Sequence, residues 1–140
     1  DLTPVEVPDF HNHRIKFESQ IIRGGLINEV VQWKPAKDSP LQIVETNCVN
    51  PHHRRDVIED SVSIFHDGEY YLPAGSWYVS EAYTFHRVKV LEQSITKLHI
   101  MENKTKNNLT IRDKNKPFRC PLKDFQKPEK ECWEIIRTFF

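Results

Sequence analysis

The sequence has few cysteines, no net charge and no long apolar run. Its three cysteines, Cys48, Cys120 and Cys132, lie far apart without a Cys-x-x-Cys pair, which argues against a disulfide framework and a cysteine-based zinc site. Lys and Arg together number 20, as do Asp and Glu, so no overall field favours nucleic acid or an anionic membrane. The short apolar runs predict neither a transmembrane helix nor a signal-peptide core. We expect a cytoplasmic protein without nucleic-acid or membrane partners.

Several catalytic motifs are missing as well. The sequence contains no Gly-x-Ser-x-Gly elbow of a serine hydrolase and no glycine loop that would cradle a phosphate. The letters HNH at residues 11–13 do not indicate an HNH endonuclease, because the residues that name that class lie far apart around a ββα-metal unit. Other chemistry has to explain these histidines.

Short β-type runs dominate the chain, and turn residues separate them. A chain of 140 residues is about one domain and can bury a hydrophobic core. The runs are rich in Val, Ile, Tyr, Phe and Thr and partly alternate with period two, which indicates strands. The predicted strands are Phe17–Ile22, Ile27–Trp33, Leu41–Val49, Ser61–Phe65, Glu69–Leu72, Trp77–Val79, His86–Leu91 and Ser94–Ile100. Their number and the tight turns predict an all-β sandwich or barrel.

The C-terminal part has a different pattern. Asn103–Lys116 is charged and rich in Asn, and predicts a loop or a hairpin. From Pro128, apolar residues recur with helical spacing. We expect one domain over 1–140, with a core at about 10–101, a loop or hairpin at 102–127 and a helix at 128–140. This helix would pack on the sheet or on a second subunit of a homodimer.

Two histidines, His11 and His13, are spaced i, i+2. On a strand such residues point to the same face, so two imidazoles would lie side by side. Imidazole is a good ligand for divalent iron, manganese, nickel and zinc. A pair of histidines is also common on ordinary surfaces, so the surrounding pattern decides.

That surrounding pattern resembles the cupin superfamily. Glu18 and Gly25 complete the form His-x-His-x4-Glu-x6-Gly, which is similar to the first cupin motif. The second motif has a histidine eleven residues after a glycine, and here His86 follows Gly75 by eleven. Other positions of the second motif differ: Glu81 and Tyr83 stand in place of Pro and Gly, and Val90 in place of Asn.

More specific features resemble small bacterial and phage-associated cupins. Their pattern of Phe, Ser, Arg-Gly-Gly and a later His-Arg-Val corresponds to Phe17, Ser19, residues 23–25 and residues 86–88. The context Phe85-His86-Arg87-Val88 is also distantly similar to thiol dioxygenases. In those enzymes a Ser-x-His-x-Tyr strand helps position and activate the substrate, and the corresponding residues 97–101 keep only the histidine, His99.

The resemblance implies a double-stranded β-helix (a jelly-roll barrel) with a single divalent metal ion, to which the short C-terminal helix predicted above would be added. The metal ligands would be His11, His13 and His86, with iron(II) preferred over manganese, nickel or zinc. Glu18 is a fourth candidate. Its parity is opposite to that of His13, so it would face the metal only if a turn or bulge around residues 14–16 reset the strand.

The same resemblance suggests an oxygenase that acts on a small molecule. His99 or Tyr83 would transfer protons, and Arg23, Trp77, Arg54 and Arg55 are candidates for contacts with the substrate. His99 could equally be a core histidine, and the two arginines could belong to a solvated loop. A non-catalytic ligand-binding cupin, or a metal-dependent isomerase or hydrolase, would fit the same residues.

Overall fold

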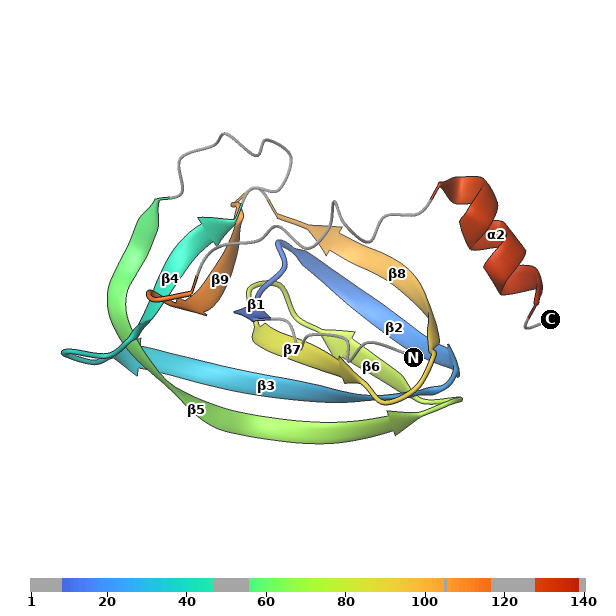
Figure 1. Cartoon of the computed structure of the whole chain (residues 1–140), viewed down its shortest axis with the longest axis horizontal. Helices are drawn as coiled ribbons and strands as arrows, with labels where there is room; N and C mark the ends of the chain where they lie inside the picture. The colour runs from blue at the N-terminus through green and yellow to red at the C-terminus, as the bar shows by residue number, and fades with distance from the viewer. Residues whose placement is uncertain (1–8, 47–55, 105, 117–127, 139–140) are drawn as a thin grey trace.

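The chain forms β-strands and one C-terminal helix (Figure 1). The structure, a computed structural model, describes residues 9–46, 56–104, 106–116 and 128–138. Its elements are β1 (Phe10–His11), β2 (Ile15–Arg23), β3 (Gly25–Pro35), β4 (Leu41–Thr46), β5 (Val57–Pro73), β6 (Trp77–Ser80), β7 (Phe85–Val90), β8 (Ile95–Asn103), β9 (Asn108–Asp113) and α2 (Glu129–Arg137). None of the helical residues in these ranges belongs to a helix long and apolar enough to cross a membrane.

The strands form two antiparallel sheets. One sheet closes into a barrel in the order β1-β7-β3-β5-β4-β9, and the other has three strands in the order β6-β2-β8. The predictions of an all-β fold and of a short C-terminal helix are therefore confirmed. In Figure 1, β2 and β8 run across the side of β1 and β7 that faces away from β4 and β9.

Strands β7 and β3 form a wall that is buried on both faces. Residues directly opposite each other on paired strands point to the same side of a sheet, and neighbours along a strand point to opposite sides. His86 lies opposite Val30, whereas Phe85 lies opposite Val31. Consecutive residues of β7 and β3 thus point alternately into the barrel and into the space between the two sheets.

The barrel side of this wall is the main hydrophobic core. It consists of six buried residues: Phe10, Val31, Ile43, Val62, Phe85 and Ile111. They come from all the strands of the closed barrel, because alternate positions of each strand point inward.

A buried ionic group lies beside this core. The side chain of Glu29 is only 3% exposed and forms ion pairs with Arg87 and with Lys89, whose Nζ lies 2.7 Å from the carboxylate. Arg87 also lies over the ring of Phe10, with its guanidinium carbon 4.2 Å from the ring centroid. Burial alone would raise the pKa of Glu29, but the hydrogen bonds from Arg87 and Lys89 lower it. The carboxylate is therefore ionised and joins β3 to β7.

The other side of the wall faces the three-stranded sheet. Phe17, Ser19 and Ile21 alternate along β2 and are buried. The ring of Phe17 lies 6.2 Å from that of His86, measured between centroids. The space between the two sheets therefore contains β2 side chains on one side and His86 on the other.

Strand β5 is longer than the sequence predicts. The segments Ser61–Phe65 and Glu69–Leu72 are parts of one strand, and no turn separates them at Asp67-Gly68. A register irregularity opposite Val30 and Val31 accommodates these residues in the ladder. The end of the Tyr70 side chain lies close over Gly68, and three of its atoms would be within 2.6 Å of a Cβ atom there.

Strand β9 lies where a loop or hairpin is predicted. Residues Asn108–Asp113 pair with β1 and β4 and close the barrel. Leu109 packs against the core and Ile111 belongs to it, but the surrounding Lys and Asn residues hide this short alternation in the sequence. The segment is therefore a structural strand, and it also contacts the chain around the first two histidines.

The turn between β2 and β3 explains the double glycine. Gly24 has a φ of +81°, a region that glycine adopts without strain. A Cβ atom on Gly24 would lie 2.3 Å from the Ser94 hydroxyl oxygen. That hydroxyl in turn accepts a hydrogen bond from the Gly25 N–H at 3.1 Å, so the close approach links this turn to the start of β8.

Candidate metal centre

His11 reaches the site from β1, the short strand that joins β7 to β9. The side chain of Asn12, next in the chain, is buried, and its Oδ1 accepts the Leu109 N–H at 2.7 Å. The Asn12 N–H donates to the Leu109 carbonyl at 3.0 Å. These two bonds fix the main chain between His11 and His13.

His13 lies just after β1, and its main chain is bonded to the turn before β7. The Tyr83 N–H donates to the His13 carbonyl at 2.8 Å. Tyr83 has a φ of +65°, a region that bulky residues rarely adopt and that costs about 1–3 kcal/mol. The Tyr83 hydroxyl accepts the Lys106 N–H at 3.2 Å. Contacts at both ends of the residue thus hold a strained backbone beside the site.

His86 comes from β7 and is buried. Its Cα is paired with that of His11 across the ladder, so both side chains point to the same face. Its Nδ1 lies 2.9 Å from Oδ1 of Asn28. Because an amide oxygen only accepts hydrogen bonds, Nδ1 carries the proton and Nε2 keeps its lone pair.

The three imidazoles form one cluster that could hold a metal ion. Each contributes a ring nitrogen, and these atoms lie within 4.8 Å of one another. The Nε2 atoms of His13 and His86 are 3.1 Å apart. Nδ1 of His11 lies 2.9 Å from the Asp9 carbonyl oxygen, so the lone pair of His11 is on Nε2, as in His86. Metal-bound histidines typically have their second nitrogen bonded to an acceptor in this way.

His13 and His86 are neutral at pH 7 because their pKa values are lowered. Burial, together with repulsion from His11, lowers the pKa of His13 to about 4. Burial, followed by repulsion from His11 and His13, lowers the pKa of His86 to about 3. A neutral imidazole is the form that binds a metal, so little proton competition is expected at these two residues above pH 5.

The surroundings of the cluster combine apolar and polar groups. The ring of Phe17 lies edge-on to that of His13, with 5.3 Å between centroids. Tyr78 of β6 lies 6.0 Å from Phe17, again between ring centroids. Burial raises the pKa of Tyr78, although a hydrogen bond with Ser19 acts in the opposite direction. The hydroxyl therefore stays protonated at neutral pH.

Glu18 and His99 are not brought to the cluster. They lie opposite each other on β2 and β8, on the face away from the buried Phe17 and Ser19. The irregularity between Lys16 and Phe17 adds a residue to β8 and none to β2. The alternation of β2 is therefore not reset, and Glu18 stays on the outer face, where His99 is exposed.

The other candidates are widely distributed. Trp77 is 57% exposed and lies opposite Gln20, on the same outer face as Glu18. Arg23 is exposed at the far end of β2 from the histidines. Arg54 and Arg55 lie outside the described residues. Among the candidates that the structure describes, Tyr83 alone contacts the site, through its main chain.

Asn12 and Asn28 are site residues that the sequence interpretation missed. Asn28 lies within an apolar run of β3, where asparagine is unfavourable. A polar residue with low strand propensity in such a run was the available signal, because burial requires a hydrogen-bond partner for its amide. Asn12 carried a similar signal between the two histidines.

Comparisons with known proteins do not assign this chain to a family, so the geometry of the site is the basis for describing it. The sequence matches no protein-family model. Searches among curated proteins and among solved structures likewise return no match to this chain. The site can thus be described as three clustered histidines, able to hold a metal ion, inside an all-β fold.

Proposed function

We propose that this chain is a mononuclear metal-binding cupin that acts as an iron(II)-dependent oxygenase on a small molecule. The observation that carries the proposal is the convergence of His11, His13 and His86, with ring nitrogens within 4.8 Å of one another. The cupin-like spacing of these histidines and the antiparallel all-β fold support it. Iron(II) is expected over manganese, nickel or zinc because the third histidine has a context similar to that of thiol dioxygenases.

The chemistry follows from the number of ligands. Three protein nitrogens leave positions for other ligands, and a bound metal would supply a site where a substrate and O2 or water bind side by side. Asn28 would orient the His86 ring, and Asp9 would orient His11. Phe17 would exclude water from one side of His13. The two outer residues Glu18 and His99 have no part in this version of the site.

The test starts with metal content. Protein purified without a histidine tag should contain a single metal ion per chain after anaerobic incubation with iron(II), measured by mass spectrometry of the metal. His86→Ala should lower the affinity for the metal by more than about a hundredfold, because it removes a ligand. His99→Ala is the matched control, since it removes an exposed imidazole from the outer face.

Oxygen uptake then separates the oxygenase from the alternatives. Iron-loaded protein should consume O2 with a substrate from a small-molecule screen, and His86→Ala protein should not. Binding of zinc or manganese without O2 uptake would favour a metal-dependent isomerase or hydrolase. If His86→Ala kept the metal as tightly as the parent protein, the three-histidine site itself would be refuted.

A further inference from the structure

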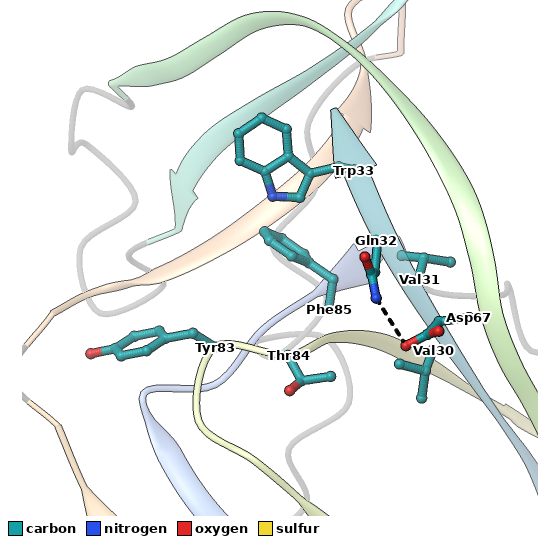
Figure 2. A pocket seen from close by; sticks show the side chains of 8 residues that line it. All are labelled: Val30, Val31, Gln32, Trp33, Asp67, Tyr83, Thr84 and Phe85. Carbon is teal, nitrogen blue, oxygen red and sulfur yellow. Dashed lines mark hydrogen bonds between the residues drawn. The ribbon is translucent and has the colours of Figure 1, made fainter. Parts of the chain in front are cut away.

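A cavity of about 340 Å³ lies at the point where β7 begins. Strand β7 starts at Phe85, but β3 continues past the opposite residue, Val31, to Pro35. The wall between the two interiors therefore ends here, and side chains from both of its faces line the cavity (Figure 2). The volume is at the small end of the range for sites that bind small molecules.

None of the three histidines lines the cavity, but residues next to two of them do. Val30, in its lining, is the cross-strand neighbour of His86 and shares its face. Thr84 also lines it, and in Figure 2 its side chain points the opposite way from Phe85. Tyr83, the third lining residue on this side, donates its N–H to the His13 carbonyl. A molecule in the cavity would thus lie directly beside the site.

The apolar lining suits a flat group. The indole of Trp33 packs against the core that contains Phe85, and both rings line the cavity in Figure 2. Aromatic faces favour stacked or edge-on contact with another ring. Among the hydrogen bonds of the described residues, none involves the indole N–H of Trp33, so this donor is available to a ligand.

The polar lining selects against anions. Asp67 is the one charged residue among those of the described chain that line the cavity. Its Oδ2 accepts a hydrogen bond from Gln32 Nε2 at 3.3 Å, drawn as the dashed line in Figure 2. The hydroxyl groups of Tyr83 and Thr84 can donate or accept. No ion pair between described residues involves Asp67, and such a carboxylate repels an anionic ligand and attracts an ammonium group.

We propose that this cavity binds the organic ligand of the three-histidine site, and that this ligand is a small neutral or cationic molecule with a flat apolar part. Its ring would contact Trp33 and Phe85, and a hydroxyl or ammonium group would contact Asp67. The position of the ligand beside the metal rests on the proposed function, whereas the preference of the cavity for neutral or cationic molecules does not.

The test uses three probes with the same phenyl ring: 2-phenylethanol, 2-phenylethylamine and 3-phenylpropionate. They are titrated into metal-free full-length protein labelled with ¹⁵N, and the indole N–H signals are followed by NMR. The Trp33 signal, assigned with Trp33→Phe, should shift with the alcohol and the amine, while the exposed Trp77 and Trp133 serve as internal controls. Binding of the anion should be at least about threefold weaker than that of the amine.

Asp67→Asn tests the selectivity without disturbing the core, because Asp67 is exposed. It should weaken the binding of 2-phenylethylamine by about threefold or more and leave 2-phenylethanol unchanged. Glu69→Gln is the matched control, an exposed acid two residues away that does not line the cavity. If no probe shifted the Trp33 signal, or if the anion bound as tightly as the amine, the proposal would be overturned.

A last measurement tests whether a molecule in the cavity lies beside the metal. Manganese(II) is added to the protein, and the relaxation of the phenylethanol protons is compared with that in His86→Ala protein. Faster relaxation only with the intact histidines places the probe beside the metal. If manganese binds but relaxation is the same in both proteins, the cavity does not serve the site. If neither manganese(II) nor anaerobic iron(II) binds, the proposed function is contradicted instead, and the metal-free result on the cavity stays intact.

Discussion

The two faces of the wall formed by β7 and β3 differ in kind although they come from the same strands. The barrel face carries Phe85 and Val31 and is a hydrophobic core. The opposite face carries His86 and Asn28, joined by a hydrogen bond. Because neighbours on a strand point in opposite directions, adjacent residues of β7 have different roles. Phe85 contributes to the hydrophobic core, and His86 contributes to the candidate metal site.

This comparison teaches that the site rests on a rigid support. The imidazole of His86 is attached to a strand whose other face is fixed by the core and by the buried Glu29 ion pairs. A site built on a packed strand holds its geometry better than one built on loops. The two faces should therefore respond differently to substitution.

The largest effect is expected on the barrel face. Ile43 is fully buried in the core, so Ile43→Ala should lower the free energy of unfolding by about 2–5 kcal/mol. Urea unfolding monitored by circular dichroism measures this loss. In conditions where the variant is folded, its metal content should equal that of the parent protein, because Ile43 belongs to the core on the barrel side of the wall. Loss of metal from the folded variant would show that the two faces are not independent.

On the histidine face, Asn28→Ala should mainly change metal affinity. The variant removes the acceptor of the His86 Nδ1–H, and such partners typically contribute about ten- to hundredfold to metal affinity. Competition with a chelator measures the change. Asn28→Asp keeps an acceptor at this position and should retain most of the affinity. Equal affinities of the Ala variant and the parent protein would exclude an orienting role for Asn28.

A third effect is a slope of stability with pH in metal-free protein. His13 and His86 have folded-state pKa values of about 4 and about 3, below the ordinary value of 6.5. Between about pH 6.5 and 4 the unfolded chain therefore binds more protons than the folded chain, and stability falls as the pH is lowered. Urea unfolding in a chelator at pH 7, 6 and 5 should show this decline.

The matched variants for this slope are His86→Gln and His99→Gln. Removal of the buried imidazole should reduce the dependence on pH, whereas removal of the exposed one should leave it unchanged. An identical slope in all three proteins would mean that the buried histidines titrate normally.

Much of this arrangement was predictable from local patterns. Alternation and turn residues located nearly every strand, and the spacing of His11, His13 and His86 anticipated their cluster. These predictions succeeded because side-chain periodicity within a strand is a local property.

The failures all depend on partners that lie far away in sequence. Glu18 could not be placed from the sequence, because whether β2 contains a bulge depends on its pairing with β8, and the extra residue turns out to lie in β8. The break expected between Ser61–Phe65 and Glu69–Leu72 is absent because an irregular pairing with β3, not visible locally, keeps the intervening residues in the strand. Strand β9 was missed because its short apolar alternation matters only once β1 and β4 lie on either side of it.

The ion pairs of Glu29 have a consequence for how the chain folds. If β7 paired with β3 one residue out of step, Arg87 and Lys89 would point away from Glu29, since a shift by one reverses the faces. An unpartnered carboxylate would then be buried, which is strongly destabilising. The same shift would point the His86 side chain into the hydrophobic core of the barrel. Glu29 thus destabilises the misaligned pairing, in which no metal centre could form.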